Sequence, residues 1–170
     1  MSNIPIATKG YFLERASTLF LRGVVLLMGA IVLAICVFGL PKLIVAELTA
    51  PSDFDYGPIF MGLYVTAVPF FIALYQTLKL LQFIDTNKAF SDLSVKALSR
   101  IKYCALVIAG MFAAGMPYVF TVAQRDDAPG VALIGFIIIG ASIVIAVFAA
   151  VLEKLLHNAI ELQREHELTV

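Results

Sequence analysis

The chain has 170 residues, of which 61% are hydrophobic and 14% are charged, and its mean hydropathy is +0.97. This composition excludes an ordinary soluble domain, which is about half apolar and about one quarter charged. Twelve basic and twelve acidic residues leave no net charge, so overall charge gives no reason to expect direct nucleic-acid binding. We expect one membrane domain covering residues 1–170.

Four apolar runs are each long enough to cross a bilayer as a helix. They cover about residues 23–41, 58–78, 103–123 and 130–152. A helix of about 20 apolar residues spans about 30 Å of hydrocarbon. The sequence therefore predicts an all-α protein, a four-span transmembrane helical bundle.

Proline and glycine mark the limits of these runs. The first run closes on Gly-Leu-Pro at 39–41, and we expect the helix to break there because proline has no backbone N–H. Residues 43–57 should then form the connection to the second run, inside which Pro69 should produce a kink. The short segment 124–129 should join the last two runs as a tight antiparallel hairpin.

Lysine and arginine are unevenly distributed between the polar segments. The N-terminal segment, the connection after the second run and the tail together hold ten, whereas the other two loops hold two, Lys42 and Arg125. Cytoplasmic segments of membrane proteins carry the excess of basic residues. The sequence thus predicts that both termini and the central connection are cytoplasmic.

The two halves of the chain share short sequence patterns. Gly-x-Pro occurs at 39–41 and 115–117, and Lys-Leu-Leu occurs at 79–81 and 154–156. The spacing from proline to lysine is 38 residues in one half and 37 in the other. One interpretation is a duplicated helical hairpin. The other is that both tripeptides are common in membrane proteins.

Small residues recur every four positions within the runs. They are Ala30 and Ala34 on the first, Gly110 and Ala114 on the third, and Ser142, Ala146 and Ala150 on the fourth. This spacing lets helix backbones approach closely. We predict that these residues pack inside the chain, with self-association into a homo-oligomer as the alternative.

The middle of every run lacks charged residues and histidine, which argues against proton relays and ion-coupled transport. The polar residues of the runs are expected to form hydrogen bonds between helices; they are Tyr64, Thr66, Tyr75, Gln76 and Ser142. The alternative is that they line a polar pathway beside the Pro69 kink.

The sequence also predicts no enzyme and no cofactor. The two histidines, His157 and His166, would lie roughly 13 Å apart on one helix, too far to share a metal ion. Phosphate-binding loops and nucleophile motifs are missing from the sequence as well.

The central connection contains the pattern of a basic amphipathic helix over residues 91–102. Ser91 suits an N-cap position and Asp92 suits a first turn. One face is apolar, with Leu93, Ala97, Leu98 and Ile101, and the other carries Lys96, Ser99, Arg100 and Lys102. The basic face could bind anionic lipid headgroups, at about 1 kcal/mol per charge; the alternative is a surface that docks a partner.

The tail, residues 153–170, should continue the fourth helix into the cytoplasm. Apolar residues recur at helical spacing, namely Leu152, Leu155, Leu156, Ala159, Ile160 and Leu162, and Gln163 extends this stripe. Glu161, Arg164, Glu165 and Glu167 give the tail a charged face. We expect the apolar stripe to lie against the basic helix or against another protein.

These two segments resemble the motifs of a bacterial membrane family catalogued as domain of unknown function 2975. The sequence FIDTNKAFS at 83–91, before the basic helix, is similar to its central signature. The sequence ELQREHELTV at 161–170 resembles its closing motif, roughly ELQEENDLTI, with His166 and Glu167 in place of an asparagine and another acidic residue. The resemblance implies a four-helix protein of the bacterial inner (cytoplasmic) membrane with both ends in the cytoplasm. Family genes often neighbour a small helix-turn-helix regulator, which implies a membrane component that binds or senses for a transcription factor.

We therefore infer a non-enzymatic regulatory or sensory protein that contacts the lipid bilayer and docks a cytoplasmic partner such as a helix-turn-helix regulator. The hypothetical partner-binding residues are Asn87, Phe90, Lys96, Arg100, Glu161, Arg164, Glu165 and Leu168. The alternatives are a small channel or permease for a neutral or apolar solute, and a structural subunit of a membrane complex.

Overall fold

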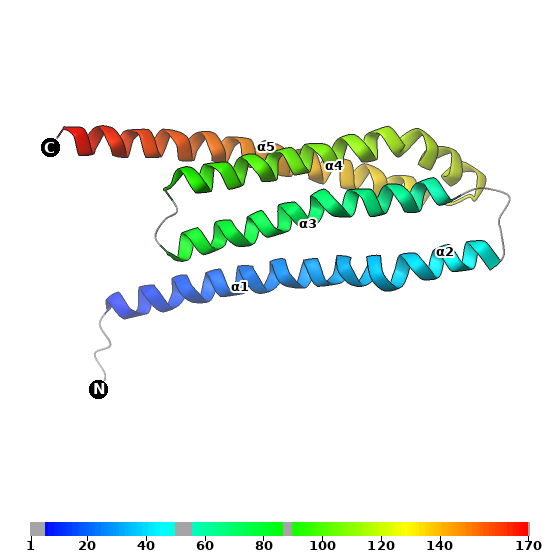
Figure 1. Cartoon of the computed structure of the whole chain (residues 1–170), viewed down its shortest axis with the longest axis horizontal. Coiled ribbons are helices and arrows are strands. Elements are labelled where there is room, and N and C mark those ends of the chain that lie inside the picture. Colours follow the sequence, from blue (N-terminus) through cyan, green and yellow to red (C-terminus); the bar gives the residue numbers. More distant parts are fainter. Residues whose placement is uncertain (1–5, 50–55, 87–89, 170) are drawn as a thin grey trace.

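The computed structural model describes residues 6–49, 56–86 and 90–169, and all regular structure within these ranges is helical. The elements in chain order are α1 (Ile6–Ala34), the π-helical turn η1 (Ile35–Gly39), α2 (Leu40–Thr49), α3 (Gly57–Asp85), α4 (Asp92–Arg125) and α5 (Pro129–Leu168) (Figure 1). Four helical segments are long and apolar enough to cross a membrane: Ala16–Ala46, Gly57–Asp85, Asp92–Arg125 and Pro129–Leu168. The predicted all-α, four-span architecture is confirmed.

The helices form an open row in which each packs mainly on its neighbours in the chain. α1 packs on α3, α3 on α4, and α4 on α5, so that α1 and α5 lie at opposite edges (Figure 1). The start of α1, the end of α5 and the α3–α4 connection share one end of the molecule (Figure 1). This arrangement agrees with the predicted topology, while the assignment of that end to the cytoplasm stays a prediction.

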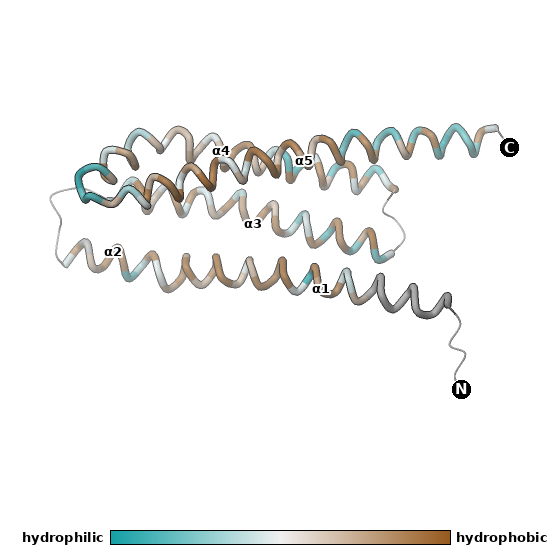
Figure 2. Tube along the Cα trace, turned by 180° about the vertical axis from the view of Figure 1, so that it is seen from behind, coloured by the Kyte–Doolittle hydropathy of each residue, from teal (hydrophilic) through white to brown (hydrophobic). Residues whose placement is uncertain are grey.

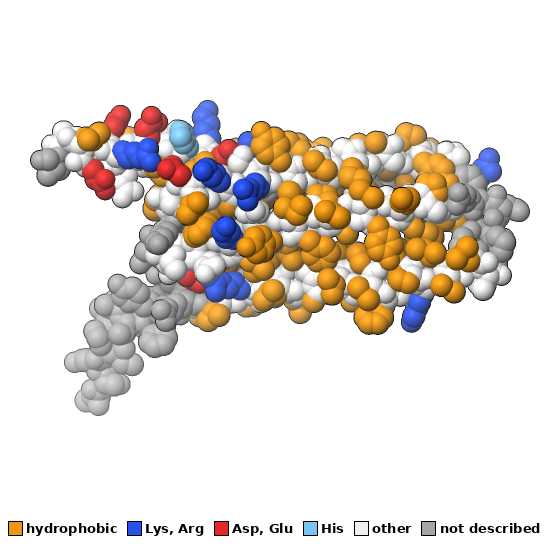
Figure 3. Space-filling view, viewed as in Figure 1, with side chains coloured by type: hydrophobic (Ala, Val, Ile, Leu, Met, Phe, Trp, Pro, Cys, Tyr) orange, Lys and Arg blue, Asp and Glu red, His pale blue; other side chains and the backbone are white. Residues whose placement is uncertain are grey.

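The surface of the spans is apolar, as a bilayer requires. Hydrophobic side chains cover the length of the helices in the space-filling view (Figure 3). Hydrophilic residues gather in the α4–α5 loop and in the last turns of α5 (Figure 2). The apolar surface is therefore bounded at both ends of the molecule, as expected for helices that contact lipid.

α1 and η1 are attached to α3 along one stripe, whose positions 22, 29 and 36 are seven residues apart. This spacing keeps side chains on one face of a helix that packs against another. Arg22 forms an ion pair with Asp85 at 2.8 Å. Gly29 is buried, and a Cβ at that position would lie 2.4 Å from Cδ2 of Leu74. The side chain of Leu74 on α3 therefore packs directly against the backbone of α1 at Gly29.

The third attachment involves a π-helical turn. The Leu40 N–H bonds to the carbonyl of Ile35, five residues earlier, rather than to that of Cys36. In this register the Cys36 carbonyl would need a donor from position 41, but Pro41 has no N–H. The hydroxyl of Tyr64 on α3 donates to this carbonyl at 2.9 Å. The π-helical turn thus leaves one carbonyl without a backbone donor, and the neighbouring helix supplies the donor.

The expected break at 39–41 is therefore wrong, because the helix continues past Pro41 to Thr49. Unwound backbone in hydrocarbon would leave several polar groups unsatisfied, each at a cost of several kcal/mol. A continuous helix keeps most of these groups bonded, and Tyr64 supplies the donor that the Cys36 carbonyl lacks. The related tripeptide at 115–117 lies within uninterrupted α4, so the two Gly-x-Pro sequences have different structures. The duplication of the hairpin stays a prediction.

Small residues form the contact between α4 and α5, as the spacing on the fourth run predicts. Ser142 and Ala146 of α5 are buried, as are Ala105 and Ala109 of α4. The pairs expected on the first and third runs are exposed: Ala30, Ala34, Gly110 and Ala114. Internal packing was therefore the wrong prediction for those four residues. Small residues at other positions of the same helices form these contacts instead.

Candidate functional site

The candidate site lies at the end of the molecule where α5 finishes, and two ion pairs between α4 and α5 define it. Lys102 Nζ lies 2.7 Å from Glu153 Oε2, and Arg164 Nη2 lies 3.0 Å from Asp92 Oδ2. From one pair to the other α4 advances ten residues and α5 eleven, which are rises of about 15 and 16.5 Å. The helices thus run antiparallel in matched register. Charged side chains of both signs gather at this end (Figure 3).

The first turn of α4 is positioned by Ser91. Its backbone is extended, with φ −135° and ψ 152°, and its carbonyl accepts from the N–H groups of Ser94 and Val95. Its hydroxyl does not cap the helix, contrary to expectation, but lies 3.4 Å from the hydroxyl of Ser94. Ser94 is completely buried. Asp92 follows in the first turn, where its negative charge interacts favourably with the helix dipole.

The apolar stripe of the tail is divided between two faces. Ile160 is buried, and Leu156 and Ala159 are half-buried, whereas Leu155 and Leu162 are each 59% exposed. On the basic helix Ala97 and Leu98 are buried, but Leu93 is exposed. One part of each stripe is therefore buried, while the other part faces outward.

A groove of about 280 Å³ separates the beginning of α4 from the tail of α5. Its lining residues are Phe90, Ser91 and Asp92 on one side and Ile160, Gln163, Arg164 and Glu167 on the other. The Asp92–Arg164 ion pair spans the groove, and both side chains remain more than 60% exposed. A ligand at this place would meet an aromatic ring, one buried isoleucine and charges of both signs.

The groove brings together only some of the partner-binding residues predicted from the sequence. Phe90 and Arg164 line it. The other described members are exposed outside it: Lys96 and Arg100 on α4, and Glu161, Glu165 and Leu168 on α5. Asn87 lies outside the described residues. The predicted partner-binding set omitted five residues that line the groove: Ser91, Asp92, Ile160, Gln163 and Glu167. The available signal was the opposite charge of Asp92 and Arg164 on two helices expected to run antiparallel.

The polar residues of the spans do not line one path. Thr66 donates to carbonyls of its own helix, at 3.0 Å for Gly62 and 2.9 Å for Leu63. Tyr64 donates to the Cys36 carbonyl in η1, and Tyr75 is 63% exposed. Because Tyr64 and Thr66 bond to carbonyls of different elements and Tyr75 is exposed, these three residues do not line one path.

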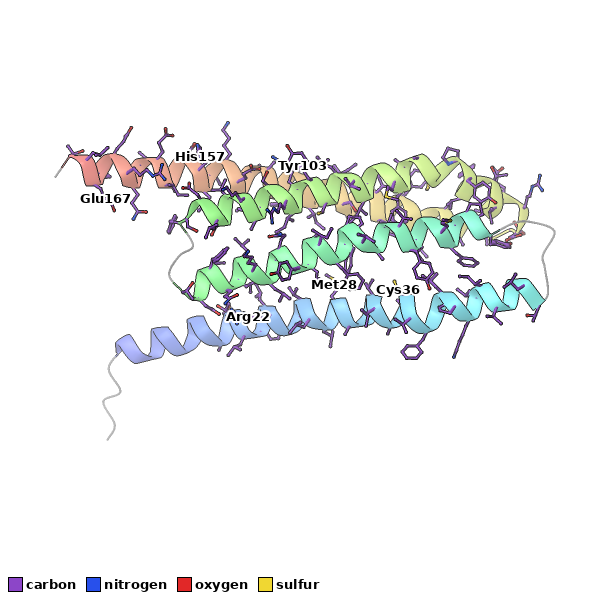
Figure 4. The ribbon with its side chains drawn as sticks, in the orientation of Figure 1. Arg22, Met28, Cys36, Tyr103, His157 and Glu167 are labelled. Carbon is purple, nitrogen blue, oxygen red and sulfur yellow. The ribbon has the colours of Figure 1, made fainter. Side chains whose placement is uncertain are left out.

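The described residues contain no group of three His, Cys, Asp or Glu that could hold a metal ion. His157 and His166 are both exposed on α5. Figure 4 labels His157 and Glu167 on this helix, with Arg22 on α1 at the same end of the molecule. The chemistry that this end offers is charge pairing and apolar contact.

Comparison with known proteins finds relatives whose function is also unknown. A family model described as "Protein of unknown function (DUF2975)" matches residues 52–170. The "Uncharacterized membrane protein YoaS" of Bacillus subtilis (strain 168) is 52% identical over 160 residues, which cover 93% of this chain and 100% of that protein. No solved structure matches the chain.

Proposed function

Because the chain belongs to the DUF2975 family, as the sequence motifs indicated, we propose that it is a non-enzymatic regulatory or sensory protein of the bacterial inner membrane. A cytoplasmic partner docks on the surface formed by the groove between α4 and α5 and by the exposed tail. A helix-turn-helix regulator is the partner that the family resemblance implies.

The length of α5 is the observation that carries the proposal. The helix has 40 residues and is about 60 Å long, whereas the hydrocarbon core is only about 30 Å thick. From Glu153 the helix continues for fifteen residues to Leu168. Such an extension gives the protein a rigid surface outside the bilayer.

The composition of this surface is that of a protein-binding site. Phe90 is 63% exposed and Leu168 is 88% exposed, and both lie near the exposed Arg164. Aromatic residues and arginine contribute most to binding energy at protein interfaces. The Asp92–Arg164 pair is exposed and exchangeable, because solvated ion pairs are worth less than about 1 kcal/mol. A charged partner can therefore replace either member.

Site-specific photo-crosslinking in living cells tests the proposal. The probe replaces Phe90, Lys96 or Arg164, and a matched control replaces Lys42, which is exposed at the other end of the molecule. We expect the first three positions to crosslink to a soluble DNA-binding protein, and Lys42 not to do so. Crosslinks only to lipid or to the chain itself would contradict the proposal. So would a chain lacking residues 161–170 that keeps the same partners and the same transcripts.

The two alternatives have different support. The separate surroundings of Tyr64, Thr66 and Tyr75 argue against the channel or permease, and flux through liposomes that disappears in Thr66→Val would revive it. The structural-subunit alternative predicts that a large membrane partner copurifies from native membranes. In that case crosslinks should map to the spans rather than to the tail.

A further inference from the structure

A second hollow, separate from the docking surface, lies within the spans near the α4–α5 loop. It is an apolar crevice of about 270 Å³ whose walls come from α3, α4 and α5. Its rim includes Pro58, Val131 and Ile134, which are exposed, and its floor includes Thr66 and Gly135, which are buried. α4 packs against both α3 and α5, so the crevice is a recess in the row of helices.

We propose that this crevice holds the acyl chain of a phospholipid. The location is the first reason. The lining begins at Pro58 in the first turn of α3 and at Val131 in the first turn of α5. It extends to Thr66 and to Ile138, eight and seven residues further, which is a rise of about 11–12 Å along each helix. A chain descending from headgroup level would follow this direction.

The chemistry of the lining is the second reason, because it offers nothing to a polar ligand. Apart from Thr66 and Tyr118 the lining side chains are apolar. The Thr66 hydroxyl is bonded to carbonyls of its own helix, and Tyr118 also has an interaction partner. A polar molecule would lose its hydrogen bonds to water and gain none in the crevice.

The size of the crevice is the third reason. An apolar cavity of about 150 Å³ in a protein accepts benzene, so the larger crevice takes a stretch of alkyl chain. If the crevice were empty, its walls would lack the dispersion contacts that lipid supplies elsewhere on the spans. The rim opens beside Val131 and Ile134, which are exposed on the surface of the spans, and acyl chains surround that surface in a bilayer.

Two glycines allow the crevice to be filled without a backbone clash. Gly62 and Gly115 line it from different helices, and a Cβ at either would meet nothing within 4 Å. Leucine at either position would occupy space that the acyl chain uses. Gly110, one and a half turns away on α4, also has nothing within 4 Å but lies outside the crevice. Gly110→Leu is therefore a matched control.

Photo-labelling in vesicles tests the proposal with the full chain. The vesicles contain phosphatidylethanolamine doped with the same lipid carrying a diazirine in one acyl chain, and mass spectrometry maps the labelled residues. We expect labelling of the crevice floor around Thr66 and Gly135 that falls several-fold in both Gly62→Leu and Gly115→Leu and is unchanged in Gly110→Leu.

Three results would overturn the proposal. The first is that the crevice floor of the wild-type chain carries no label, and the second is that neither leucine variant reduces its labelling. The third is that excess palmitic acid abolishes the labelling of the floor whereas excess phospholipid does not. The last would assign the crevice to a free alkyl ligand. If both leucine variants fail to fold, the positions labelled in the wild-type chain still test the proposal. Labelling does not depend on the docking surface, so the two proposals can fail separately.

Discussion

The bond from Tyr64 to the Cys36 carbonyl gives a prediction about how much the Tyr64 hydroxyl stabilises the π-helical turn. Tyr64→Phe removes only the hydroxyl and leaves the ring between α1 and α3. The carbonyl then has no donor, because Leu40 bonds elsewhere and Pro41 has no N–H. Tyr64 is 39% exposed in the chain, but lipid surrounds it, so no water replaces the lost donor.

The expected loss follows from the unsatisfied carbonyl. A buried polar group that loses its partner costs about 1–3 kcal/mol, whereas hydrogen bonds between membrane helices average about 0.6 kcal/mol with a maximum near 1.7. We expect Tyr64→Phe to lower the free energy of unfolding by about 1–1.5 kcal/mol, within both ranges. The measurement is reversible unfolding in mixed micelles, followed by circular dichroism.

The control is the same substitution made in a Pro41→Ala background. An alanine at position 41 restores a backbone N–H, so the Cys36 carbonyl has a donor whether the π-helical turn persists or becomes regular α-helix. Tyr64→Phe should then cost less than about 0.5 kcal/mol, because the bond it removes is no longer needed. An equal loss in both backgrounds would refute the reasoning and would mean that the hydroxyl acts elsewhere.

Three further predictions concern packing and charge. Gly29→Leu should lower the free energy of unfolding by about 1–3 kcal/mol by forcing α1 away from α3, because a Cβ at position 29 already meets Leu74 at 2.4 Å. The control is Gly23→Leu, since a Cβ at position 23 meets nothing within 4 Å. Equal losses in the two variants would contradict the close packing at Gly29. Ser94→Leu should disturb the packing of α4, because Ser94 is completely buried and leucine would overfill its site. Since α4 packs on α5, trypsin should then cleave after Arg164 faster, and an unchanged rate would show that the tail is held elsewhere. Arg164→Ala should change the free energy of unfolding by less than about 1 kcal/mol. Lys102→Ala should lower it more than Arg164→Ala does, because both side chains of the Lys102–Glu153 pair are only 23% exposed. A larger loss in Arg164→Ala would be inconsistent with these exposures.

The sequence predicts the spans well because their signal is strong and local. A run of about 20 apolar residues has few alternatives to a transmembrane helix, and the four runs all became helices. The predicted helix end at 39–41 was less accurate, because proline marks the end of a helix in water-soluble proteins. In hydrocarbon the cost of free backbone groups outweighs the cost of one missing donor, and the donor came from Tyr64, which is 28 residues away in sequence from Cys36.

The groove was predicted only in part for a different reason. Helical spacing places Arg164 on the tail, and its charge suits Asp92, but spacing alone does not say that the two side chains come within reach of each other. That contact depends on the register between α4 and α5, whose packed faces include small buried residues such as Ala105 and Ala146. The crevice likewise needs three helices in place before Gly62 and Gly115 line one space, so no pattern within a single run indicates it.

The open row of helices has a consequence for how the protein is made. Each helix packs on its neighbours in the chain, so every contact surface is complete soon after the second of its two helices leaves the ribosome. Short connections also keep the entropy lost on closing each loop small, and local contacts favour fast assembly. We therefore expect the chain to assemble in the order of synthesis. In that order α5 completes the groove between α4 and α5, and a nascent chain stalled before α5 would lack it.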